Sequence, residues 1–170
     1  MIVGAKKILA DFDRLSQVDI QEAMETSIQH VRSEAVDRVR TDTGELKQSI
    51  YAETKATRNG VRGTCWSNKK YAKYVEFGTG KKGQENHAGI SPEVTPMYSM
   101  RPWWIHEGSG ANEVDRATAE KYGWFYIDTP KGRFYQCTGQ AAHPFMYPAL
   151  ADSTEFIERI FAEKINEVMK

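Results

Sequence analysis

The sequence predicts an α+β fold: an antiparallel β-sheet flanked by a long N-terminal helix and a C-terminal helix, with a long loop and a β-hairpin inserted. Apolar residues recur at helical spacing near both ends, β-rich segments surround turn signals between them, and Gly- and Pro-rich sequence interrupts the pattern. A length of 170 residues with 40% hydrophobic content suits one core. We therefore expect a single domain over residues 1–170, with residues 78–139 inserted within it.

Two apolar stripes predict helices in the first forty residues. The first stripe consists of Ala5, Ile8, Leu9, Phe12 and Leu15, and the second of Ile20, Met24, Ile28, Val31, Ala35 and Val39. Asp19, followed three residues later by Glu22, is typical of a capped helix start, and Gly44 can take the left-handed conformation that ends a helix. A third stripe predicts the C-terminal helix from about residue 149 to 169: Leu150, Ile157, Ile160, Phe161, Ile165 and Val168.

Two β-hairpins are predicted between the helices. Residues 50–57 and 61–67 are β-rich and flank Arg58-Asn59-Gly60, and Asn-Gly is the strongest short hairpin signal. Residues 124–128 and 133–137 flank a second turn of Thr, Pro, Lys and Gly.

Residues 78–122 are rich in Gly, Pro and polar residues, which predicts a long loop. The loop contains Trp103 and Trp104, an apolar pair that needs a covering surface. Apolar aromatics on a mobile loop suit docking to a partner protein. We therefore expect removal of residues 89–110 to leave the fold intact and to impair docking.

No residue pattern predicts catalysis, a cofactor or a metal. His106-Glu107 begins an HExxH motif, but Gly110 stands where the second His would be. A metal site built from His87, His106 and Glu107 is the remaining alternative. There is no GxSxG or P-loop motif, and Cys65 lies within a predicted strand, where a small buried thiol is expected. We therefore expect a protein that is not an enzyme.

The two cysteines, Cys65 and Cys137, are too few for a disulfide scaffold and too far apart for a CxxC motif. The N-terminus is acidic by Asp11 and lacks the pattern of a signal peptide, and no run approaches the roughly twenty apolar residues of a membrane span. We expect a protein made in the cytoplasm, soluble there, with no membrane partner.

The charge balance is zero overall and uneven along the chain. Lys and Arg total 23, as do Asp and Glu, which argues against a dedicated nucleic-acid or membrane-surface binder. Residues 11–37, however, carry two bases and seven acids (2 − 7 = −5), and residues 55–82 carry eight bases and one acid (8 − 1 = +7).

Within the basic segment, lysines alternate with tyrosines: Lys69, Lys70, Tyr71, Lys73 and Tyr74. Bases beside aromatics are used by proteins that bind single strands, so a nucleic-acid-binding module over residues 55–82 is the alternative function. In the competing interpretation the tyrosines and Phe77 lie at helical spacing and pack inward.

Three segments follow one another along the chain: TGELKQSI at 43–50, YAKYVEFGT at 71–79 and GQAAHPFMYPAL at 139–150. In this order they resemble the tail-completion family of long-tailed bacteriophages, which comprises head-tail joining and minor tail component proteins. With the flanking helices the resemblance covers most of the chain. It departs between residues 78 and 139, because minimal members pass more directly to the third segment.

The resemblance implies a structural virion protein that assembles as a ring, expected to be a hexamer, where the tail meets the head. The partners it implies are further copies of the chain, head-side connector and tail tube proteins, and DNA that passes through the lumen without sequence readout. The protein would lie in the neck or tail of the virion, and in the host cytoplasm during assembly.

Two sets of residues are candidates for these contacts. We expect a subunit or partner interface to include Tyr71, Tyr74, Phe77, Trp103, Trp104, Phe145 and Met146. Lysines that could line the lumen or face DNA are Lys69, Lys70, Lys81 and Lys82. Phe145 has two possible places, the core or a neighbouring subunit. The opposite charges suggest that a basic hairpin meets the acidic helix of the next copy.

Overall fold

The computed structural model describes residues 20–40, 44–58, 60–108, 113–121 and 123–169. These residues belong to two compact units, Met1–Ala72 with Phe145–Lys170, and Lys73–Pro144. The chain combines helices with strand pairs that are antiparallel, apart from one short parallel pair, and has a long N-terminal and a C-terminal helix, which confirms the predicted fold class. The first apolar stripe of the sequence, from Ala5 to Leu15, lies outside the described residues.

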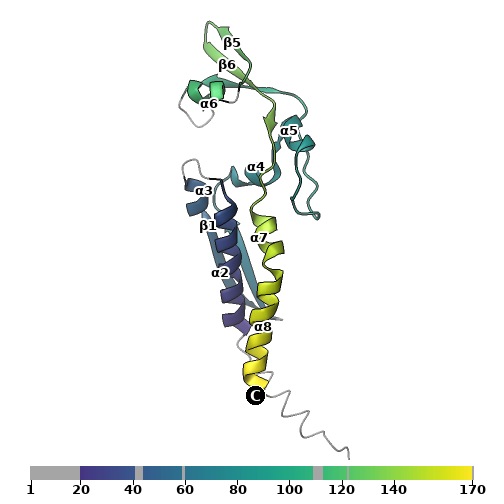
Figure 1. Ribbon diagram of the computed structural model, residues 1–170. Helices are drawn as coiled ribbons and strands as arrows, with labels where there is room; N and C mark the ends of the chain where they lie inside the picture. The colour runs from purple at the N-terminus through teal and green to yellow at the C-terminus, as the bar shows by residue number, and fades with distance from the viewer. Residues whose placement is uncertain (1–19, 41–43, 59, 109–112, 122, 170) are drawn as a thin grey trace, which may run out of the picture. The chain divides into compact units, whose positions relative to one another are not determined.

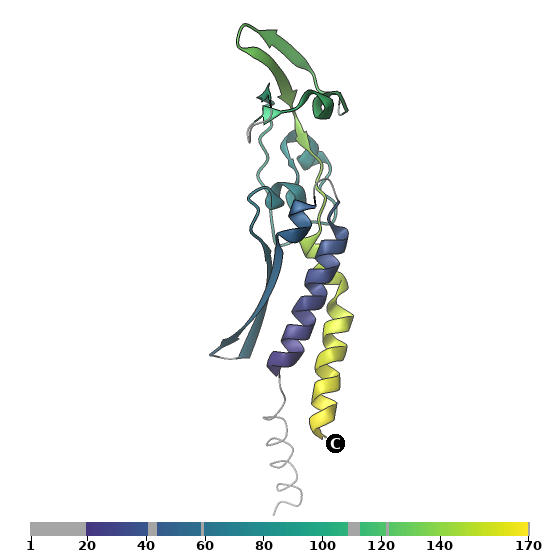
Figure 2. The same cartoon turned by 90° about the vertical axis from the view of Figure 1, so that its left-hand side faces the viewer.

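The first unit packs a hairpin and two further helices around one central helix (Figures 1 and 2). Its elements are α2 (Ile20–Arg38), α3 (Glu45–Gln48), β1 (Ile50–Thr57), β2 (Gly60–Ser67), α7 (Met146–Asp152) and α8 (Thr154–Met169). Helix α2 contacts both strands as well as α7 and α8. The strands pair antiparallel from Ile50 opposite Ser67 to Thr57 opposite Gly60, which confirms the first predicted hairpin.

Small residues let α2 pack closely on two sides. Ala23, Ser27, Val31 and Ala35 are buried at four-residue spacing. The Ser27 hydroxyl donates to the Ala23 carbonyl at 2.8 Å, so its burial leaves no polar group without a partner. Ile20, which the apolar stripe placed in the core, is exposed. Ile20 is the first residue of α2, at the end of the stripe. Ser27 was missed for another reason, because hydropathy does not register a small polar residue at a helix contact.

The C-terminal helix begins earlier than predicted and is divided. Helix α7 starts at Met146 and includes Pro148, which is tolerated because amides of the first turn have no helical partner in any case. Ser153 separates α7 from α8 and is fully buried. Its hydroxyl donates to the Ala149 carbonyl at 2.6 Å, and its own carbonyl accepts from the amide of Ile157 at 2.9 Å.

The second unit contains a four-stranded sheet in the order β4-β3-β6-β5. Its elements are α4 (Ala72–Phe77, which starts at the boundary), α5 (Gly80–Glu85), β3 (Trp103–Glu107), β4 (Glu113–Val114), α6 (Arg116–Lys121), β5 (Tyr126–Thr129), β6 (Gly132–Cys137) and β7 (Gly139–Gln140). The pair β5–β6 confirms the second predicted hairpin.

The prediction of one long loop over residues 78–122 is wrong for much of its length. The segment holds α5, β3, β4 and α6. Strand β3 pairs with β6, from Trp103 opposite Cys137 to His106 opposite Phe134, and such long-range pairing leaves no local turn signal. Removal of residues 89–110 would delete an inner strand of the sheet, so the expectation that the fold survives this deletion is also wrong.

Glycines permit a close backbone crossing in the second unit. Thr79 bridges to Gln140 and Gly80 to Gly139. Gly139 has φ 98°, and a Cβ on it would lie 1.9 Å from the Thr79 carbonyl oxygen. Only glycine combines this conformation with this contact. The crossing therefore joins the segment after α4 to the segment after β6.

Candidate functional site

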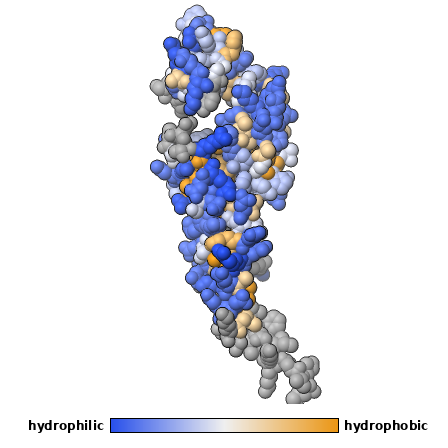
Figure 3. All heavy atoms as spheres, viewed as in Figure 1, coloured by the Kyte–Doolittle hydropathy of each residue, from blue (hydrophilic) through white to orange (hydrophobic). Residues whose placement is uncertain are grey.

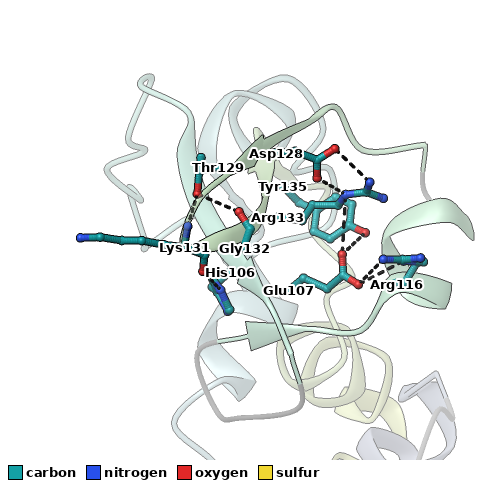
Figure 4. Close-up of polar contacts among 9 residues, drawn as sticks. All are labelled: His106, Glu107, Arg116, Asp128, Thr129, Lys131, Gly132, Arg133 and Tyr135. Atoms are coloured by element: carbon teal, nitrogen blue, oxygen red, sulfur yellow. Dashed lines mark hydrogen bonds and ion pairs between the residues drawn. The ribbon is translucent and has the colours of Figure 1, made fainter.

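One face of the four-stranded sheet carries an interconnected set of charged side chains, here called the polar network (Figure 4). Arg133 on β6 donates to both oxygens of Asp128 on β5, with distances of 2.7 Å from Nε and 3.1 Å from Nη2. Arg116 on α6 donates to Oε1 of Glu107, 3.0 Å from Nε and 2.8 Å from Nη2. The Tyr135 hydroxyl donates to Oε2 of Glu107 at 3.1 Å. The polar network therefore ties α6 to strands β3, β5 and β6.

Hydrogen bonds within the polar network stabilise the charged forms of Asp128, Arg133 and Arg116. The hydrogen bond from Arg133 lowers the pKa of Asp128 and in turn raises that of Arg133. The hydrogen bond to Glu107 raises the pKa of Arg116. A carboxyl group with a lowered pKa is a poor proton donor near neutral pH, so Asp128 suits an ion pair better than acid catalysis.

A shallow hollow of about 360 Å³ lies beside the polar network and is lined by His106, Glu107, Arg116, Asp128, Thr129, Gly132 and Arg133. His106 donates from Nε2 to the Lys131 carbonyl at 3.0 Å, and His87 hydrogen-bonds the Gly83 carbonyl at 3.1 Å. Across the described parts of the chain, no group of three or more His, Cys, Asp and Glu side chains is arranged to hold a metal ion. The hollow is lined by side chains that already bind one another.

The opposite face of the sheet carries several apolar side chains that are exposed in the described chain, beside Gln136 and His106. Trp104 lies opposite Gln136, and Ile127 lies opposite Phe134, so these side chains share the face away from the polar network. The ring centroids of Trp104 and Phe125 are 6.2 Å apart. Trp104 is 42% exposed, Phe125 63% and Ile127 40%. We call Trp104, Phe125, Ile127 and Phe134 the apolar face. Figure 3 shows hydrophobic residues at the surface near β5 and β6.

The polar network predicts a stability change in acid. The pKa of Asp128 is lowered in the folded protein, so its contribution is present above the usual carboxyl range and is lost as pH falls through the folded value. Asp128→Asn should therefore lower the unfolding midpoint at pH 7, and the difference from wild type should shrink below about pH 4. Urea unfolding at both pH values measures this. A difference that stays constant with pH would contradict the assignment.

The two tryptophans predicted to dock together do not share a surface. Trp103 and Trp104 are consecutive on β3 and point to opposite faces of the sheet, since successive strand residues alternate. Trp104 belongs to the apolar face, whereas Trp103 lies on the side of Tyr135 and Cys137. Phe125 and Ile127 were missed by the prediction, although their period of two within a predicted strand was the available signal.

The tyrosines of the second family-like segment, residues 71–79, lie at the surface of the chain. Tyr71 and Tyr74 are both exposed, so the interpretation in which they pack inward is wrong for this subunit. Phe77 is half-buried, and Glu76 is buried in place of the tyrosines. Lys73 lies over the Tyr74 ring at 5.0 Å, which adds a cation–π contact at the surface.

Phe145 and Met146 occupy different environments within the first unit. Phe145 is 1% exposed, so of its two predicted places the structure shows the core. A side chain buried to this degree is not available to a neighbouring subunit. Met146 is half-buried, with its sulfur 4.0 Å from that of Cys65 on β2.

Two of the four predicted lumen lysines are engaged in ion pairs. Lys69 Nζ lies 2.8 Å from Glu45, and Lys81 Nζ lies 3.7 Å from Glu85. Lys70 and Lys82 are exposed. The basic segment is divided between the two units, so it does not form one continuous element.

Acidic residues of α2 also find partners within the chain. Glu22 pairs with Lys164 at 2.7 Å, and Glu34 pairs with Arg38, which in turn reaches Asp152 at 2.7 Å. These intrachain pairs reduce the charge that α2 offers to another copy. The predicted contact between an acidic helix and a basic hairpin of the next subunit stays a prediction.

Comparison with known proteins adds evidence for the class of protein. Residues 6–78 match a family of phage tail proteins. The family is described as "Bacteriophage HK97-gp10, putative tail-component". The matched range ends within the second of the three family-like segments and includes α2, α3, β1, β2 and α4. No curated protein and no solved structure matches the chain.

The match to the HK97-gp10 family confirms the predicted relation to phage tail proteins. It supports a structural component of a phage tail and a location in the virion. None of the helices in the described residues is both long and apolar enough to cross a membrane. The family match ends before the sheet that carries the apolar face, so it gives no information on that sheet.

Proposed function

We propose that the protein is a non-enzymatic tail-completion subunit, which forms a ring and joins the phage tail to the head. The observation that carries the proposal is the match of residues 6–78 to a phage tail-component family, reinforced by the three family-like segments. The partners would be further copies of the chain, the head-side connector and the tail tube proteins. DNA would pass through the lumen without sequence readout.

Uncovered apolar surfaces in both units support association with other proteins. In the first unit α8 contains no buried residue, and Leu150 on α7 and Ile165 on α8 are exposed large side chains. In the second unit the apolar face exposes Trp104 and Phe125. Exposed apolar residues that lie together, as Trp104 and Phe125 do, are typical of protein interfaces, where aromatic residues carry much of the binding energy.

The apolar face gives a direct test of the proposal. The double variant Trp104→Ala, Phe125→Ala removes exposed rings, so the fold should persist, whereas joining of heads to tails should fall about tenfold or more. Infectious titre and electron microscopy of lysates measure joining when the variant replaces the wild-type chain. Met97→Ala is the matched control, because Met97 is 99% exposed and lies outside the apolar face. Normal joining by the folded double variant would remove this face from the proposal.

The alternative, a nucleic-acid-binding module over residues 55–82, makes a separate prediction. Its lysines would have to face a phosphate backbone, yet Lys69 and Lys81 already have carboxylate partners. Binding of single- or double-stranded DNA by the isolated protein at physiological salt would favour the alternative. Absence of binding would favour a tail subunit that DNA merely passes.

A further inference from the structure

The β1–β2 hairpin has two open edges. Its strands form a two-stranded sheet, and among the described residues no other strand joins it. The Asn68 amide donates to the Ser49 carbonyl at 3.2 Å, which fixes 49–68 as a hydrogen-bonded pair. Hydrogen-bonded pairs recur at every second position, so Ala52, Thr54 and Ala56 direct their backbone N–H and C=O groups to the outer edge of β1. By the same alternation, every second residue of β2 directs its backbone N–H and C=O groups to the outer edge of that strand.

These edges lack most of the usual protection against pairing. Natural edge strands are short, contain Pro or a bulge, or carry charged side chains, and β1 and β2 have only the last of these, Glu53, Lys55 and Arg62 on the face away from α2. Here each strand has eight residues, the register is unbroken, and neither strand contains proline. The side chains on the face toward α2 are uncharged: Ile50, Ala52, Thr54, Ala56, Val61, Gly63, Cys65 and Ser67. Such edges are suited to strand addition.

The two faces of the hairpin differ in what covers them. Gly63 packs against Met24 and Ile28 of α2, where a Cβ would lie 2.9 Å from the Met24 sulfur. The other face carries Tyr51 and Trp66, whose ring centroids are 5.9 Å apart, and neither ring is buried. In Figure 2 the hairpin lies along α2 near its base and extends away from the helices at its tip.

We propose that the hairpins of successive copies join edge to edge, β1 of one copy antiparallel to β2 of the next, into a closed β-barrel inside the ring. This inference rests on the ring proposed above and adds its inner architecture. A strand from a different protein would cover one edge and leave the other open. A closed ring of copies pairs both edges of every hairpin, which is how barrels remove free edges.

The side of the hairpin covered by α2 must face outward, because a helix cannot fit within a barrel lined by the same strands. The inner wall then consists of Tyr51, Glu53, Lys55, Arg62, Thr64 and Trp66. Its charged residues are one acid and two bases, a net charge of 2 − 1 = +1 for each copy. This weakly basic wall would attract DNA without holding it, as transit requires. In this proposal the lumen is lined by the β1–β2 hairpin, and not by the lysines between residues 69 and 82 that the sequence suggested.

Barrel geometry also fixes the register between copies. Strands in a barrel must be staggered, and a step of two residues keeps every side chain on its face. Each copy supplies two strands and one step of two residues, so the shear number of the whole barrel equals its number of strands. The same ratio of shear number to strand number gives a strand tilt of about 36° in the eight-stranded barrel. The step of two residues could run in either direction along the strand. Sheet twist makes barrel strands coil in a right-handed sense around the axis, and with the α2 side outward this sense places Lys55 of one copy opposite Thr64 of the next. Within one copy Lys55 lies opposite Arg62.

Disulfide trapping tests this pairing. In a chain whose Cys65 and Cys137 are replaced by alanine, Lys55→Cys with Thr64→Cys should give a reducible ladder of covalent oligomers, up to the closed ring, in assembled particles. Within one copy these positions are diagonal neighbours about 7–8 Å apart, too far for an internal disulfide. Glu53→Cys with Arg62→Cys is the matched control, with the same internal spacing and the opposite step, and should give no ladder. A ladder from the control pair alone, or from neither pair, would overturn the proposal.

A second variant acts on the backbone. Ala56→Pro removes an N–H that points to the open edge, so the subunit should fold as the wild type does, whereas ring formation should be lost. Ala56→Val keeps the N–H and should assemble normally. Analytical ultracentrifugation of purified protein and microscopy of lysates measure both. Rings formed by the Ala56→Pro protein would overturn the proposed barrel but not the proposed ring. A wild-type chain that joins no tails would instead refute the proposed function.

Discussion

Gly139→Ala is expected to lower the free energy of unfolding of the second unit by about 4 kcal/mol, the sum of a strained left-handed backbone and an overpacked contact. The Cβ would lie 1.9 Å from the Thr79 carbonyl oxygen, and a backbone atom cannot move aside as a flexible side chain can. Urea unfolding followed by tryptophan fluorescence measures the loss, because three of the four tryptophans, Trp103, Trp104 and Trp124, lie in this unit.

Gly123→Ala separates the two contributions. Gly123 also has a positive φ, 60°, but a Cβ there would meet nothing within 4 Å. This control should cost about 1 kcal/mol, from conformation alone. Equal losses for the two variants would mean that the crossing at Gly139 is looser than the structure shows.

Phe145→Ala is expected to destabilise the first unit by about 3–5 kcal/mol, since it leaves a cavity where a fully buried ring packs. Phe145 is among the largest fully buried side chains of the described chain. Far-ultraviolet circular dichroism during urea unfolding follows this unit, because its long helices α2 and α8 dominate the signal.

The same substitution at an exposed site provides the comparison. Phe125→Ala removes a ring that is 63% exposed and should change the unfolding free energy by less than about 0.5 kcal/mol. A Phe145→Ala protein as stable as wild type, yet unable to assemble, would return Phe145 to an interface and contradict its assignment to the core.

The parts of the fold that follow from local signals could be predicted from the sequence. The Asn-Gly turn gave the first hairpin, and helical spacing gave α2 and α8. Strand β3 was missed, because its five residues are defined by pairing with β6 some thirty positions later. The burial of Ser27 and Ser153 was missed too, since each satisfies its hydroxyl through a backbone carbonyl four residues earlier, which hydropathy does not report.

The arrangement of side chains on the candidate surfaces was less predictable from the sequence than the fold. Two consecutive tryptophans such as Trp103 and Trp104 can share one surface patch in a loop, but in a strand their side chains point to opposite faces of the sheet. The polar network was invisible for a related reason: Glu107, Arg116 and Arg133 are distant in sequence and meet only through the order of the strands. The edges of β1 and β2 are open because no further strand of the described chain pairs with them. Strand pairing of this kind is seen in a structure and has no local signal in the sequence.

The central claim, that this protein joins tail to head, is tested most directly by removing it. A nonsense mutation early in its gene should yield DNA-filled heads and separate tails in electron micrographs of the lysate. Purified protein added to that lysate should restore joined, infectious particles. Normally joined particles in the absence of the protein, or a lysate without any tails, would contradict the account.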